Sequence, residues 1–144
     1  MKIVVDTNIL FSALVNPTGT ISGIFLKRDS KLDFYTPSTA LKELNDHRVK
    51  LAKASKLTHQ EVEDLQKVLI LQINVIEIKC ISSSARATAV NILFDVDRFD
   101  IPILALNIDL KAKLWTGDKK LINGLLRKGY MDVINTSVLA DLTK

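Results

Sequence analysis

The amino-acid sequence predicts an α/β fold, a three-layer α/β/α sandwich around a central parallel sheet. The alternation of two kinds of segment predicts it. Short apolar runs, several of them rich in β-branched residues, alternate with longer segments of helical periodicity along the chain. Alternation of this kind favours right-handed βαβ units, whose strands run parallel and whose helices cover both sheet faces. No repeat, linker or low-complexity stretch interrupts the pattern, so we expect a single domain over residues 1–144.

The first half of the chain is predicted to contain two strands and four helices. The β-branched run 3–5 is typical of a buried strand, and Asn16-Pro17 stops the helix that follows it. A helix capped by Thr18 or Thr20 comes next. After the second strand, Thr36-Pro37 is predicted to open a long helix, with Thr36 as its N-cap. Thr58 and Glu61 form a capping box for the fourth helix. In order, these elements are expected at 3–5, 8–15, 20–28, 32–35, 36–57 and 58–71.

The second half is predicted to contain three strands and three helices. Serines at 82–84 offer caps for the first helix. The helix opened by Asp100 is apolar on nearly every side, so we place it in the core, with Pro102 tolerated in its first turn. Gly129 ends the last helix. In order, these elements are expected at 75–78, 82–94, 100–110, 114–116, 119–127 and 133–134.

The composition is that of a globular chain with a basic balance. Hydrophobic residues make up 47% of it, which excludes disorder, and no apolar run reaches the roughly 18 residues of a membrane span. With no signal-peptide pattern and one cysteine, Cys80, we expect a cytoplasmic protein and place Cys80 in the core. The net charge of +4 fits a polyanionic partner, but an ordinary basic surface explains it equally well.

Four acidic residues fall where a parallel sheet of this kind places its ligands. Asp6 and Asp118 each follow a predicted strand, and Glu43 and Asp100 lie near helix N-termini that can face the same sheet edge. For any one of them, a helix cap or a solvated side chain is an equal explanation; their order along the chain favours a metal site. Carboxylates brought together repel one another, and a divalent cation relieves that repulsion. All-oxygen ligands suit Mg²⁺ or Mn²⁺.

Five motifs occur in a fixed order. They are VVDTNIL from Val4, LKEL from Leu41, DRFD from Asp97, LAL from Leu104 and LWTGDKKL from Leu114. In order and spacing they resemble the PIN domain family over nearly the whole chain. That resemblance implies an α/β/α fold and a metal-dependent ribonuclease, and many small members resemble VapC toxins of toxin–antitoxin pairs.

The resemblance also implies roles for individual residues. Its catalytic acids match Asp6, Glu43, Asp100 and Asp118, with the metal on Asp6, Asp100 and Asp118. Asn8 and Thr116 match its supporting polar positions. Asp97 is an additional ligand, or replaces Asp100 if the helix starts earlier. The expected activity is endoribonucleolytic hydrolysis of single-stranded RNA, assisted by Mg²⁺ or Mn²⁺.

Partners are predicted from the basic residues and the apolar helices. We expect RNA to contact basic side chains in two stretches, with plain solvation as the alternative for the second: Arg48, Lys50 and Lys53, then Lys119 and Lys120. His47 and His59 are expected on the surface. The helices over 36–73 carry more apolar side chains than one face of a small domain needs, so we predict a homodimer. The resemblance adds an antitoxin protein as a further partner.

Three other functions compete with this interpretation. A PIN-type module could bind RNA or a protein without cleaving, although the intact acid quartet argues against it. A haloacid dehalogenase-type phosphatase also begins with an apolar strand and Asp, but it requires a second Asp where this chain has Asn8. A receiver domain requires an acidic pair near the first strand and an acceptor Asp after a central strand, and the sequence provides neither.

Overall fold

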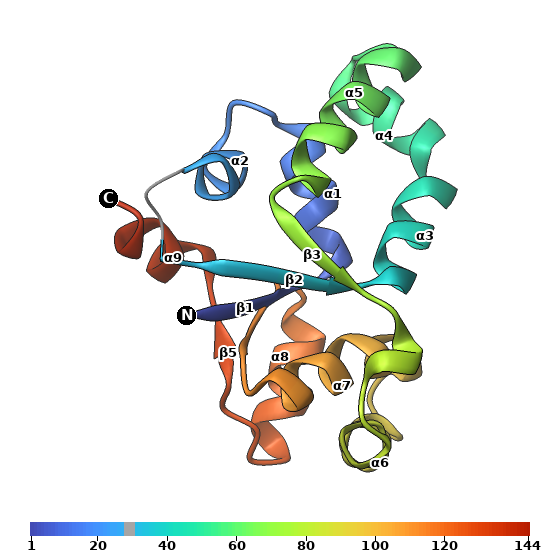
Figure 1. Cartoon of the computed structure of the whole chain (residues 1–144), viewed down its shortest axis with the longest axis vertical. Coiled ribbons are helices and arrows are strands. Elements are labelled where there is room, and N and C mark those ends of the chain that lie inside the picture. The colour runs from blue at the N-terminus through green and yellow to red at the C-terminus, as the bar shows by residue number, and fades with distance from the viewer. Residues whose placement is uncertain (28–30) are drawn as a thin grey trace.

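The computed structural model describes residues 1–27 and 31–144, and it confirms the predicted α/β/α sandwich (Figure 1). Five parallel strands form one sheet in the order β3-β2-β1-β4-β5. The strands are β1 (Lys2–Val5), β2 (Asp33–Pro37), β3 (Ile73–Ile76), β4 (Lys113–Trp115) and β5 (Val133–Ile134). The strand order reverses between β1 and β4, the point where open α/β sheets bind ligands.

Helices cover both faces of the sheet (Figure 1). On one face lie α1 (Thr7–Val15), α2 (Thr20–Leu26), α3 (Ser38–Asp46), α4 (Arg48–Ser55), α5 (His59–Ile70) and α9 (Thr136–Leu142). On the other lie α6 (Ser83–Leu93), α7 (Ile101–Leu110) and α8 (Lys119–Arg127). Two 3₁₀ turns, η1 (Ile78–Cys80) and η2 (Arg98–Asp100), precede α6 and α7.

The central strand β1 contributes to both hydrophobic cores. Ile3 and Val5 pack into the core under α1 to α5, whereas Val4 packs into the core under α6, α7 and α8. This alternation follows from the two-residue period of a strand. All three side chains are fully buried, which explains why the run is apolar at every position instead of alternating with polar residues.

The predicted helix over 36–57 is wrong at its start and in its middle. Thr36 lies within β2, which runs to Pro37; it is fully buried and donates its hydroxyl to the carbonyl oxygen of Val5 at 2.9 Å. The helix therefore begins at Ser38 and has no side-chain N-cap. His47 then separates α3 from α4 with backbone angles outside the helical range, φ −103° and ψ 18°.

Other differences from the sequence prediction are smaller. Strand β3 ends at Ile76, so the predicted strand over 75–78 is two residues too far along the chain. Cys80, expected in the core, is exposed because the chain leaves the sheet through η1. Gly19 precedes α2, so neither Thr18 nor Thr20 caps it. That helix ends at Leu26, and the predicted limit, Arg28, lies outside the described residues. Helix α9 was not predicted.

Several local predictions are confirmed. Thr58 and Glu61 form both hydrogen bonds of the capping box on α5, and Ser82 caps α6. Gly129 has φ +79° just after α8, a backbone conformation that glycine adopts without strain. Among the described helices, no single helix is long and apolar enough to span a membrane. Helices α1 and α2 together meet that criterion of length and composition, but the pair is bent by 104°.

Candidate active site

Asp6 is held at the carboxyl edge of the sheet, between the ends of β1 and β4. Its backbone N–H donates to the carbonyl oxygen of Trp115 at 3.0 Å, which extends the pairing of the two strands. Its Oδ2 accepts the hydroxyl of Thr116 at 2.7 Å, and its Oδ1 accepts the backbone N–H of Thr7 at 2.7 Å. Only 5% of Asp6 is exposed. The carboxylate therefore caps α1 and is also fixed in one orientation at the candidate site.

Asp118 lies beside Asp6 because β4 is the neighbour of β1 in the sheet. It caps α8: its Oδ1 accepts the backbone N–H groups of Lys120 at 3.0 Å and Leu121 at 3.2 Å. Its Oδ2 takes part in neither bond. Its own backbone N–H donates to the Thr116 hydroxyl at 3.1 Å. One hydroxyl thus connects the two acidic residues that follow β1 and β4.

Asp100 and Asp97 take different places in the structure. Asp100 is the residue before α7, yet its carboxylate makes no capping hydrogen bond. Asp97 does cap, because its Oδ1 accepts the backbone N–H of Phe99 at 2.9 Å and so fixes the η2 turn. The geometry favours Asp100 as the site residue and Asp97 as the residue that holds the turn before it.

The four acids predicted from the sequence line one open pocket of about 410 Å³. Its lining residues come from α1, α3, α4 and the starts of α7 and α8; they are Asp6, Thr7, Asn8, Phe11, Ser12, Glu43, His47, Lys50, Asp100 and Asp118. We call this the acidic pocket. Asn8, predicted as a supporting residue, belongs to it. Thr116 does not line the pocket, but its hydroxyl donates to the carboxylate of Asp6, which does.

Burial and mutual repulsion disfavour the ionised form of these carboxyl groups. Burial, together with the negative charges of Asp6, Asp97, Asp118 and Glu43, raises the pKa of Asp100 to about 7. Burial also raises the pKa of Asp6, although the hydrogen bonds from Thr116 and Thr7 lower it in part. The pKa of Glu43 is raised by burial and by the charge of Asp6. The pocket therefore concentrates negative charge that a cation would stabilise.

The chemistry of these side chains fits a hard divalent cation, since the four acids offer carboxylate oxygens. In the described part of the chain, no three Asp, Glu, His or Cys side chains lie close enough to enclose an ion as they stand. Asp6 is fixed by its two hydrogen bonds, so closure around an ion would require rotation of Asp100, Asp118 or Glu43 side chains.

The predicted basic residues divide into two groups. Lys50 lines the acidic pocket. The other four do not line it: Arg48, Lys53, Lys119 and Lys120. Arg48 donates to Asn45 at 3.2 Å, and the pair at the start of α8 is exposed. Those four residues remain predicted RNA contacts outside the pocket.

The sequence did not identify His47 as a pocket residue. It is exposed, as expected, but it lines the acidic pocket at the junction of α3 and α4. Its Nδ1 lies 2.7 Å from the backbone carbonyl oxygen of Glu43. The available signal was its spacing of four residues from Glu43, which places both on one side of the chain when that segment is helical.

The fold and the pocket define an α/β/α protein with an acidic site at the carboxyl edge of a parallel sheet. The chain belongs to the PIN domain family, since the family described as "PIN domain" matches residues 4–136. No curated protein sequence matches the chain.

Two solved structures share its fold. The structure of VapBC2 from Rickettsia felis, bound to a DNA fragment from their promoter, has a chain with a TM-score of 0.70 and 17% identity. That match covers 94% of this chain and 98% of the other. For VapBC-1 from nontypeable Haemophilus influenzae, the TM-score is 0.65 at 17% identity, with 95% and 99% covered.

Proposed function

We propose that this PIN domain is an endoribonuclease that hydrolyses phosphodiester bonds in single-stranded RNA with the help of Mg²⁺ or Mn²⁺. The observation that carries the proposal is the convergence of Asp6, Glu43, Asp100 and Asp118 on one pocket at the sheet edge. These acids come from four separate segments of the chain. If they served only as helix caps, they would have no reason to converge on one pocket.

Asp6, Asp100 and Asp118 would hold the metal, and Glu43 would complete the charge of the site. A bound divalent ion supplies a water of lowered pKa and offsets charge on the phosphate. The chain itself contributes fixed geometry, because Thr116 and Thr7 orient the Asp6 carboxylate. Lys50 provides positive charge for a phosphate oxygen.

We further propose that the chain is a toxin of a toxin–antitoxin pair that acts in the cytoplasm. The support is its membership of the PIN domain family and a fold shared with chains of two VapBC structures. A short neighbouring reading frame that encodes a small DNA-binding protein would be the expected antitoxin. Co-purification of the two expressed chains would test the pairing.

The alternative is a PIN-type module that binds RNA or a protein without cleaving it. It is favoured by the finding that no three candidate ligands in the described residues enclose an ion as they lie. One assay separates the two functions: single-stranded RNA incubated with the purified chain and Mg²⁺, Mn²⁺ or EDTA. Cleavage with either metal and none in EDTA is the expected result. Binding without cleavage under every condition would support the alternative.

A further inference from the structure

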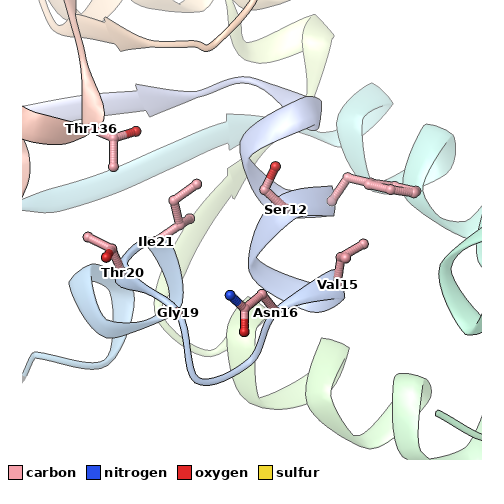
Figure 2. Close-up of a pocket in the computed structure, with 8 residues that line it drawn as sticks. Ser12, Val15, Asn16, Gly19, Thr20, Ile21 and Thr136 are labelled. Carbon is pink, nitrogen blue, oxygen red and sulfur yellow. The ribbon is translucent and has the colours of Figure 1, made fainter. Parts of the chain in front are cut away.

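A second pocket adjoins the acidic pocket along helix α1. Its volume is about 520 Å³, within the range of small-molecule sites, and it lies between α1, the start of α2 and the start of α9 (Figure 2). Phe11 and Ser12 line both pockets. Residues of α1 therefore line both pockets, which lie next to each other along roughly two turns of this helix, about 11 Å.

The two pockets differ in chemistry. The acidic pocket is lined by several titratable side chains, whereas the described residues that line the second pocket are all uncharged. Its walls combine apolar groups with hydroxyl and amide groups: Phe11, Val15 and Ile21, and Ser12, Asn16, Thr20 and Thr136. The Thr136 hydroxyl accepts the indole N–H of Trp115 at 3.0 Å, which leaves its own proton to be donated. Such a lining suits a flat, uncharged ring with polar edges.

Lys50 lies at the junction of the pockets. Its Nζ is 5.7 Å from the centre of the Phe11 ring, and among the described residues that line the acidic pocket it is the one lysine or arginine. Lys50 and Phe11 thus lie between the carboxylates of the acidic pocket and the uncharged second pocket. This arrangement is complementary to a nucleotide, which has a charged phosphate and an uncharged base. The ammonium can contact a phosphate while the ring and the pocket receive a base.

We infer that the second pocket is a nucleobase subsite, in which the base of a nucleotide next to the scissile phosphate packs against Phe11 while Lys50 contacts its phosphate. This inference rests on the proposed function and names how that site would recognise single-stranded RNA. Phe11 is a positioning residue in this arrangement. Unstacked bases of single-stranded RNA commonly bind aromatic side chains in this way.

The test measures the contribution of the base to binding. The full chain with Asp118→Asn, which is expected to bind without cutting, is titrated by fluorescence anisotropy. The probes are a labelled oligoribonucleotide of one base type and an abasic ribose–phosphate oligomer of equal length. The base-containing probe should bind at least about fivefold more tightly, because stacking on an aromatic ring contributes on the order of that factor per base. Phe11→Leu should remove most of this preference, and Phe11→Tyr should retain it.

Two further variants test a second lining residue and control for the general loss of an aromatic group. Ser12→Leu places apolar bulk at an exposed position where the pockets meet, and it should also reduce the preference. Phe94→Leu makes the same substitution as Phe11→Leu at a residue that is 62% exposed and lines neither pocket, and it should leave the preference unchanged.

The outcomes separate this inference from the proposed function. Metal-dependent RNA cleavage by the wild-type chain, with equal binding of both probes, would overturn the base subsite alone. A base preference that persists in Phe11→Leu and Ser12→Leu would do the same. No binding of either probe would overturn both proposals. A base preference lost in these two variants, in a chain that never cuts RNA, would support the subsite and overturn the nuclease.

Discussion

The hydroxyl of Thr116 donates to Oδ2 of Asp6 across the boundary between β4 and β1, at 2.7 Å. Both residues are nearly fully buried, with 3% and 5% exposed. The bond lowers the pKa of Asp6 against the effect of burial. Thr116 therefore stabilises the charge of an acid that has little contact with water.

The first prediction follows from that bond. Thr116→Val keeps the side-chain shape but removes the hydroxyl, so the buried Asp6 oxygen loses a partner. We expect the free energy of unfolding to fall by about 1–3 kcal/mol, measured by urea titration at pH 7. Thr116→Ser retains the hydroxyl and should cost less. Equal stability of Thr116→Val and the wild type would show that the bond adds nothing to folding.

The second prediction concerns catalysis. Asp118→Asn removes a charge from the acidic pocket, but asparagine also caps helices well, so α8 should keep its N-terminus. We expect RNA cleavage to fall by about a hundredfold or more while the melting temperature changes little. Asp109→Asn is the matched control, because this exposed acid does not line the pocket. A folded Asp118→Asn chain with wild-type cleavage would remove that residue from the mechanism.

The third prediction is a pH dependence of stability in EDTA. The pKa of Asp100 is about 7 in the folded chain, against 3.8 as its ordinary value. Between these pH values the folded state holds a proton that the unfolded chain has released. The free energy of unfolding should therefore fall as pH rises from about 4 to about 7. After discounting for partial exposure, Asp100 should contribute roughly 1–2 kcal/mol of this change.

Urea titrations at several pH values check the effect of Asp100. The pH slope should be smaller in Asp100→Asn, whose amide does not titrate, than in the wild type. Asp109→Asn should keep the wild-type slope. The pKa of Asp6 is raised too, so the difference between wild type and Asp100→Asn is the quantity to compare. Identical slopes would mean that Asp100 titrates normally.

The fourth prediction is the homodimer. Large apolar side chains are exposed on α4 and at the end of α5: Val49 at 65%, Val68 at 47% and Leu71 at 82%. Light scattering at tens of micromolar should give twice the mass of one chain. Leu71→Glu should shift the protein towards monomer, whereas Leu126→Glu, on the opposite face of the sheet, should not. A wild-type monomer at that concentration would contradict the prediction.

The sequence predicted the parallel sheet, and it also predicted that Asp6 and Asp118 would lie at the end of a strand. Apolar runs identify the strands of a buried parallel sheet, and parallel strands bring their carboxyl ends to one edge. That is why Asp6 and Asp118 could be placed from sequence alone. Asp100 and Asp97 could not be separated, because the distinction depends on which carboxylate caps the η2 turn.

Two of the errors involve contacts between distant segments. Thr36 has the local pattern of a helix cap, but its hydroxyl bonds to Val5, which keeps it in β2. His47 interrupts a helical pattern whose apolar spacing continues on both sides, so the break and its place in the pocket were missed. Helix α9 begins at Thr136, whose hydroxyl accepts the Trp115 N–H. Such bonds are invisible in a local pattern.

The pairing of β1 with β4 also has a consequence for how the chain is made. Val5 pairs with Trp115, so the two strands that carry Asp6 and Asp118 are separated by most of the sequence. Closing so long a loop is slow compared with forming local helices. During synthesis from the N-terminus, Asp6 is exposed long before Asp118 exists. A chain on the ribosome that stops short of Asp118 therefore lacks the acidic pocket, and any nuclease activity would be delayed until that residue has emerged.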